Sequence, residues 1–198
     1  MPAAPLGITA NLADHIPAEN PLTPAKVELG LQLFFGKRLS RDNTVSCATC
    51  HDPARGWGDA APGSTGIRRQ RGGRSAPIVP NRILGLTPFW DGRAATLEEQ
   101  AVGPVGNSIE MGFTIEEAAE RLNGIEGYAL QFKAVFSGPA TPDWIGKAIA
   151  SFERTILSGA NKNDSYEQAY PYFDWDPADE EDADDVAKGE QILLLAVR

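Results

Sequence analysis

Apolar residues along the chain repeat with the period of an α-helix in its best-patterned segments. A Thr-Pro pair at 23–24 suits the N-cap and first position of a helix, and Val27, Leu31, Phe34 and Phe35 then fall on one face. A second Thr-Pro pair at 141–142 precedes an apolar stripe of period 3.6 over 144–156. No segment alternates polar and apolar residues for long enough to predict a sheet, so the pattern favours a mostly α fold.

Further helix starts are indicated by capping boxes. Thr96 is followed by Glu99, and Thr114 by Glu117, in the Thr-x-x-Glu spacing that caps the first turn of a helix. Apolar residues over 125–136 predict one more helix. The regular structure is therefore expected on both sides of one long irregular region.

That region covers roughly residues 52–88 and is rich in Gly, Pro and Arg. Structureless loops longer than about 12–15 residues are uncommon in compact domains and are usually functional or wrapped around something. We therefore expect this segment to be a long irregular loop around a bound group.

Composition adds that the chain is an ordinary soluble protein. Of its 198 residues, 42% are apolar and 23% are charged, the usual balance of a globular domain. No apolar run approaches the roughly 18 residues needed to span a bilayer. The start of the chain lacks the basic residues and apolar stretch of a secretory signal.

The formal charge of −9 is concentrated near the C-terminal end. Residues 174–185 contain eight acids and no Lys or Arg. Such a run is expected to be a solvated linker kept open by self-repulsion, with a docking patch for a basic partner as the alternative. Four arginines over 68–74 lack interleaved aromatic residues, so nucleic-acid binding is not expected. We assign an N-terminal extension to residues 1–21 and an acidic linker to 171–185.

Cys47, Cys50 and His51 form the Cys-x-x-Cys-His attachment motif of c-type haem. Two thiols on one helical turn reach the two vinyl groups of the porphyrin, and the next residue places an imidazole under the iron. The chain has no other cysteine and only one other histidine, His15, which leaves a structural zinc site short of ligands. A thioredoxin-type pair would need a βαβ setting that the helical pattern does not offer. The sequence predicts one covalent haem c with His51 as the proximal iron ligand.

The sixth iron ligand separates catalysis from electron transfer. An iron with two strong protein ligands passes electrons, whereas an open position binds and activates a small molecule. The candidates are His15, within the expected N-terminal extension, and Met111, the internal methionine in a loop that also bears Gly and Asn. Methionine is more often core filler than ligand, so the residues alone leave both arrangements open.

A longer pattern surrounds the haem motif. The block Phe-Trp-Asp-Gly-Arg-Ala at 89–94 is followed by Gln100, Pro104 and Glu110, at offsets of ten, fourteen and twenty from Trp90. This pattern resembles the N-terminal haem domain of bacterial di-haem cytochrome c peroxidases and MauG-like enzymes. The resemblance implies a cytochrome c-type helical haem domain with long irregular loops, which we assign to residues 22–170.

The resemblance also implies roles for four side chains. Glu110 matches the distal acid that moves a proton between the peroxide oxygens, and Gln100 matches the amide that hydrogen-bonds the bound oxygen species. Pro104 matches the proline that shapes this pocket, and Trp90 matches the indole that relays electrons between two haems. Each side chain taken singly has an ordinary structural explanation, and their joint spacing favours the distal-pocket assignment.

Three departures from the family qualify what the resemblance implies. Many members carry a histidine after the haem motif that caps the resting iron, but residues 52–88 contain none, which implies an open iron as in the MauG-like branch. Ser75 replaces the Asn that usually ligates an interdomain calcium ion, so the calcium site is not carried over with its usual ligands. Residues 186–198 resemble only the start of a second haem domain, which is truncated or absent here.

The expected function is that of a peroxidase-type oxidoreductase that reduces hydrogen peroxide or forms a ferryl oxidant. Its electrons would come from a second haem domain or subunit, a donor cytochrome or a cupredoxin. Covalent haem attachment implies a periplasmic or otherwise extracytoplasmic protein whose leader has been removed. Two alternatives remain: a mono-haem electron-transfer cytochrome c with His51 and Met111 as axial ligands, and a redox subunit of a larger complex.

Overall fold

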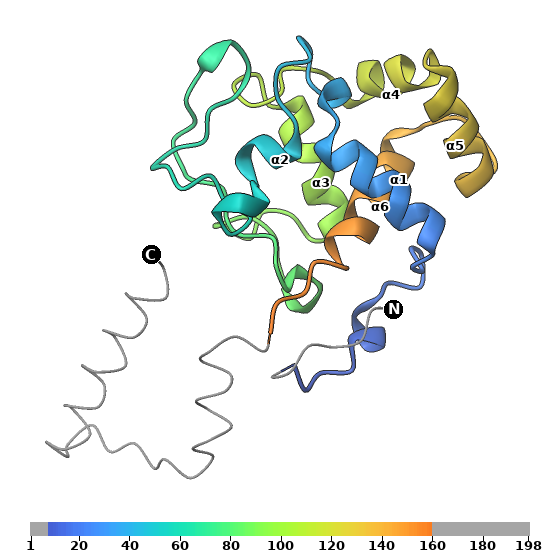
Figure 1. Ribbon diagram of the computed structural model, residues 1–198, viewed down its shortest axis with the longest axis horizontal. Helices are drawn as coiled ribbons and strands as arrows, with labels where there is room; N and C mark the ends of the chain where they lie inside the picture. The colour runs from blue at the N-terminus through green and yellow to red at the C-terminus, as the bar shows by residue number, and fades with distance from the viewer. Residues whose placement is uncertain (1–7, 160–198) are drawn as a thin grey trace, which may run out of the picture. The chain divides into compact units, whose positions relative to one another are not determined.

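The structure, a computed structural model, describes residues 8–159. As the pattern predicts, the regular structure in this range is helical (Figure 1), and its extended pairings are two isolated β-bridges. The α-helices are α1 (Pro24–Phe35), α2 (Cys47–Cys50), α3 (Leu97–Gly106), α4 (Ile115–Asn123), α5 (Glu126–Phe136) and α6 (Pro142–Glu153). Short 3₁₀ turns are η1 (Leu12–His15), η2 (Lys37–Leu39), η3 (Pro53–Arg55), η4 (Ile67–Arg69) and η5 (Arg82–Leu84). The mostly α fold class is confirmed.

The helix starts lie at the predicted caps, with one difference in detail. At α4 the capping box is complete, because Glu117 N donates to Thr114 Oγ1 and Thr114 N donates to Glu117 Oε2, both over 3.1 Å. At α3 only half of the box forms. Glu99 N donates to Thr96 Oγ1 over 3.1 Å, but the Glu99 carboxylate accepts from Ala95 N instead of the N-cap N–H.

The core is built where α1 crosses α6. These two helices pack together more extensively than any other pair of described elements, and α3 packs on α6 beside them. Gly30 allows the close approach, because a Cβ at this position would overlap the carbonyl oxygen of Ala148. Burying each large apolar side chain contributes about 1.5–3 kcal/mol. The largest fully buried apolar side chains are Phe34, Phe132, Leu29, Leu33, Leu39, Leu122, Ile145, Ile149 and Val105.

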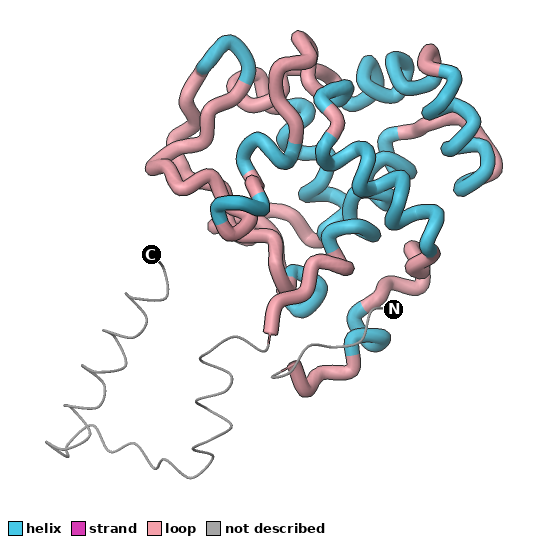
Figure 2. The backbone as a smooth tube through the Cα atoms, in the orientation of Figure 1, coloured by secondary structure: helices cyan, strands magenta, loops and turns pink. Residues whose placement is uncertain are grey.

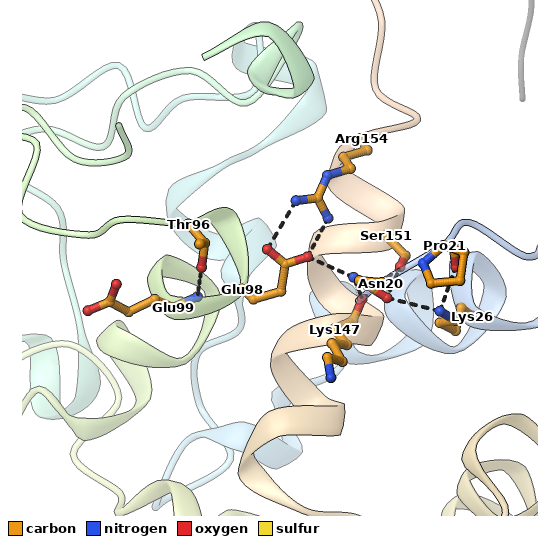
Figure 3. A network of polar contacts seen from close by, with 9 residues as sticks. All are labelled: Asn20, Pro21, Lys26, Thr96, Glu98, Glu99, Lys147, Ser151 and Arg154. Atoms are coloured by element: carbon orange, nitrogen blue, oxygen red, sulfur yellow. Dashed lines mark hydrogen bonds and ion pairs between the residues drawn. The ribbon is translucent and has the colours of Figure 1, made fainter. Parts of the chain in front are cut away.

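A partly buried polar network ties α3 to α6 and to the segment before α1 (Figure 3). Two guanidinium nitrogens of Arg154 donate to the two carboxylate oxygens of Glu98 over 2.6 and 3.0 Å. Asn20 donates to the same carboxylate over 2.7 Å and to the Lys147 carbonyl over 3.0 Å, and it accepts from Lys26 Nζ. The network therefore fixes the start of α3 against α6.

The segment between α2 and α3 is the expected long loop, broken by the turns η3, η4 and η5 (Figure 2). Asp59, which is buried, organises its middle by accepting hydrogen bonds from Ser64 Oγ, Ala61 N and Ala76 N. Ile67 N donates to the Glu110 carbonyl over 2.8 Å, so the loop is joined to the turn after α3. The helices α4 and α5 lie at the end of the domain away from this loop (Figure 1).

The expected domain boundaries at residues 21/22 and 170/171 stay predictions. The compact unit that contains the described residues ends at Gly159. Residues 160–170, the predicted acidic linker 171–185 and residues 186–198 lie outside the described range. In the range 8–159, no helix combines the length and apolar character needed to cross a membrane.

Candidate haem-binding site

One cavity of about 390 Å³ collects the side chains that the sequence predicted for the site, with the exception of His15. These side chains come from α2, the loop before α3, α3 itself and the turn after it. They are Cys47, Cys50, His51, Trp90, Gln100, Pro104, Glu110 and Met111. Their roles stay predictions. The structure shows that the attachment motif and the predicted distal residues line the same cavity.

The two thiols are presented by α2, a single helical turn. Ser46 and Thr49 cap this turn reciprocally, which fixes where it begins. Burial raises the pKa of the Cys47 thiol to about 12, so that this thiol stays neutral. Two thiols on one turn, both lining one cavity, are the arrangement that attachment to the two vinyl groups of a porphyrin needs.

His51 follows directly after α2. Its Nδ1 lies 3.4 Å from the Trp57 carbonyl oxygen, and a proton on Nδ1 would suit this contact and leave the Nε2 lone pair for an iron. Burial lowers the pKa of His51, and this favours the neutral imidazole. A neutral imidazole fits an iron ligand. The thiols, the imidazole and the cavity therefore fit a c-type haem.

Glu110 lies in the turn that follows α3. Asn107 Nδ2 donates to Glu110 Oε1 over 3.1 Å, and the Asn107 carbonyl accepts from Gly112 N over 2.8 Å. Burial raises the pKa of Glu110, and the positive charge of Arg93 partly opposes this. The carboxyl group is thus oriented from within its own turn and holds its proton more tightly than an exposed glutamate.

Gln100 and Pro104 line the cavity from α3. They are four residues apart and therefore lie on one face of the helix. Pro104 is inside α3 and does not end it, since the helix continues to Gly106.

The remaining predicted residues differ widely in exposure. Trp90 is 64% exposed at the cavity edge, and its indole N–H donates to the Ser75 carbonyl over 2.9 Å. Met111 is 4% exposed and belongs to the core cluster as well as to the cavity wall. His15 is exposed in η1 and is not among the residues that line the cavity.

Sequence reasoning missed Glu153, which lines the cavity from α6. The residue is 5% exposed, and burial raises its pKa to about 8. A signal was present in the pattern: residue 153 follows Ile149 by four positions, so an acid stands on the apolar stripe of its helix.

The sequence pattern also gave no role to Arg74 and Arg93, which line the cavity. Asp91 accepts from Arg74 over 3.0 Å and from Arg93 over 2.9 Å, and these bonds hold the pKa of Asp91 below its usual range. The Arg93 guanidinium also lies over the ring of Phe89, 3.4 Å from its centroid. The cavity edge therefore carries an ordered group of charges next to Trp90.

Comparison with known proteins identifies the family of the chain. A sequence model described as di-haem cytochrome c peroxidase matches residues 24–170. The methylamine utilization protein MauG of Methylorubrum extorquens is 43% identical over 145 residues, which are 72% of this chain and 41% of that protein. The cytochrome c551 peroxidase of Nitrosomonas europaea is 39% identical over 171 residues, which are 81% of this chain and 51% of that protein.

A solved structure shows the same fold. The crystal structure of a MauG-like protein associated with microbial copper homeostasis superposes with a TM-score of 0.71 and 32% identity, over 78% of this chain and 47% of that chain. This chain therefore spans about half the length of the proteins it matches.

Proposed function

The chain belongs to the di-haem cytochrome c peroxidase family, and on that premise we propose that residues 22–170 form a peroxide-reacting haem domain. The family is haem c based and uses two haems, whereas this sequence carries one attachment motif. Cys47 and Cys50 would hold this haem through thioether bonds, and His51 would ligate its iron. The reaction is the reduction of hydrogen peroxide, or the use of peroxide to oxidise a partner, in an extracytoplasmic compartment.

The observation that supports this proposal most is the shared cavity. Glu110, Gln100 and Pro104 line the same space as the attachment motif, although α2 and α3 are far apart in the sequence. When bound, the haem supplies the exchange of electrons with peroxide. The Glu110 carboxyl group moves a proton from one peroxide oxygen to the other, and the Gln100 amide holds the substrate by a hydrogen bond.

Electrons must reach this cavity from outside. Trp90 is exposed at its edge, and its ring is fixed by the bond to the Ser75 carbonyl. We therefore assign Trp90 as the relay from a second haem domain or subunit, a donor cytochrome or a cupredoxin. A calcium ion at Ser75 is not part of the proposal, because the usual Asn ligand is replaced there.

One observation favours a second candidate function. Met111 lines the same cavity as His51, so a carrier with these two residues as axial ligands would use the same fold. The optical spectrum of the ferric holoprotein separates the two functions. A high-spin spectrum supports an open iron and the peroxidase, whereas a low-spin spectrum with a sulfur–iron band in the far red supports Met111 as a ligand.

The direct test of the peroxidase is Glu110→Gln. The variant keeps the shape of the side chain and an acceptor for Asn107 but removes the acid, so the reaction with peroxide should slow by about 10²–10⁴-fold. Glu116→Gln, which removes the same charge from an exposed position on α4, is the matched control and should react at the parent rate. Peroxide reaction at the parent rate in Glu110→Gln would overturn the proposal.

A further inference from the structure

A second cavity, of about 400 Å³, adjoins the haem cavity. The two cavities have four lining residues in common, which therefore form the partition between them: Phe89, Arg93, Pro104 and Glu110. One of these four is the acid assigned to proton transfer. Glu110 thus borders both the space for the haem and a separate space on its other side.

The second cavity reaches the surface. Arg93, Glu99, Gly103 and Gly106, which line it, are all exposed, and so is Asn107. Arg93, Glu99 and Asn107 provide hydrogen-bond donors and acceptors along its wall. The cavity therefore joins solvent to Glu110 through polar surroundings that suit a small hydrogen-bonding molecule.

A haem held by Cys47, Cys50 and His51 would occupy the space that these residues line. The second cavity borders Glu110 but contains none of these three residues, so it would stay available beside a bound haem. We propose that the second cavity is the channel by which hydrogen peroxide and protons reach Glu110 from solvent, with Phe89 and Arg93 as its inner gate. This proposal rests on the proposed function, because the channel leads to an iron that is open to a small molecule.

The gate is held from both sides. On one side, the Arg93 guanidinium covers the Phe89 ring and is itself fixed by Asp91. On the other, the ring lies against α3, since a Cβ added at Gly103 would come within 3.3 Å of Phe89 Cζ. Phe89 also has φ of +65°, a backbone conformation that is uncommon for a bulky residue and directs this ring. A gate fixed in this way favours small molecules over bulky hydroperoxides.

Gly106→Phe tests the channel without touching the assigned site. Gly106 lines the second cavity only, and a Cβ there would meet nothing within 4 Å, so a phenylalanine ring can fill the space. Gly127→Phe on α5 is the matched control, because a Cβ there also meets nothing within 4 Å and the residue lines neither cavity. The measurement is the rate of cyanide binding to the ferric holoprotein by stopped-flow spectroscopy.

We expect Gly106→Phe to slow cyanide association and dissociation by the same factor, about tenfold, equivalent to a barrier raised by roughly 1.4 kcal/mol. The dissociation constant and the ferric spectrum should stay unchanged, because access changes and affinity does not. A second variant, Phe89→Ala, removes the gate and should speed the binding of imidazole, a bulkier probe, more than that of cyanide.

Two outcomes would overturn the channel. The channel is wrong if cyanide binds to Gly106→Phe and Gly127→Phe at the same rate and imidazole binding is unchanged in Phe89→Ala. That result would leave the proposed peroxidase function standing. If the parent protein binds no cyanide, its iron has no open position, and both the proposed function and the channel are wrong.

Discussion

Asn107 donates a hydrogen bond from its side-chain Nδ2 to Oε1 of Glu110 over 3.1 Å. The same side chain accepts from Ile109 N through Oδ1 over 2.9 Å. One asparagine therefore shapes the turn after α3 and aims the carboxyl group that borders both cavities.

Replacing this asparagine should misplace the acid while keeping the turn. Asn107→Asp retains an oxygen to accept from Ile109 N but loses the donor to Glu110 and puts a second carboxylate beside it. We expect the reaction with peroxide to slow by about 10–100-fold, because a hydrogen bond to an ionisable group contributes roughly 1.5–3 kcal/mol. Stopped-flow mixing of the ferric protein with peroxide measures this. An unchanged rate would show that Asn107 has only a structural role in the turn.

The pair of Glu98 and Arg154 should be an important stabilising contact of the fold. Their side chains are 17% and 6% exposed, so Arg154→Ala leaves a partly buried carboxylate without its cation. The free energy of unfolding should fall by up to about 3–5 kcal/mol, and the loss is reduced because water partly screens the two side chains. The control is Asp143→Ala, which breaks the exposed pair with Lys147 and should cost less than about 0.5 kcal/mol. Urea denaturation measures the free energy of unfolding of both variants. Equal losses in the two variants would contradict the prediction.

The same pair makes stability depend on acid pH. Burial alone would raise the pKa of Glu98, but hydrogen bonds from Arg154 and Asn20 outweigh it and leave the pKa below its ordinary value of 4.5. Stability from this group is therefore present above pH 4.5 and is lost as the pH falls through the folded pKa. The melting temperature of the parent should drop more steeply than that of Glu98→Gln as the pH falls below 4.5. Parallel curves would exclude this carboxylate as the cause.

Glu153 should give the opposite dependence. Its pKa is raised to about 8, so between pH 4.5 and 8 the folded protein keeps a proton that the unfolded chain has lost. Stability from this group is full below pH 4.5 and decreases as the pH rises to about 8. The melting temperature of Glu153→Gln should therefore be higher than that of the parent at pH 8 and close to it at pH 5. A constant difference across this range would contradict a buried, protonated Glu153.

Covalent attachment should depend on the two thiols and ligation on the imidazole. Cys47→Ala should lower the share of protein that keeps haem after denaturation, as measured by intact mass. His51→Ala should change the optical spectrum and the reduction potential, because the protein no longer supplies the imidazole ligand of the iron. His51→Ala with the parent spectrum and potential would exclude His51 as the proximal ligand.

The sequence by itself determined the helices, the attachment motif and the family resemblance. Thr23, Thr114 and Thr141 mark helix starts through bonds within a single turn, so the signal is local and can be read from neighbouring residues. The Cys-x-x-Cys-His spacing is likewise confined to one turn, α2.

Only the tertiary structure decided which distant side chains share a space. Glu153 lies in the cavity wall, and its pKa is raised by burial that contacts between distant segments create. Phe89 and Arg93 divide two cavities because loop and helix segments meet there, and no local pattern encodes that meeting. Caps and periodicity are set by residues a few positions apart, whereas burial and cavity walls are set by contacts between segments far apart in the chain.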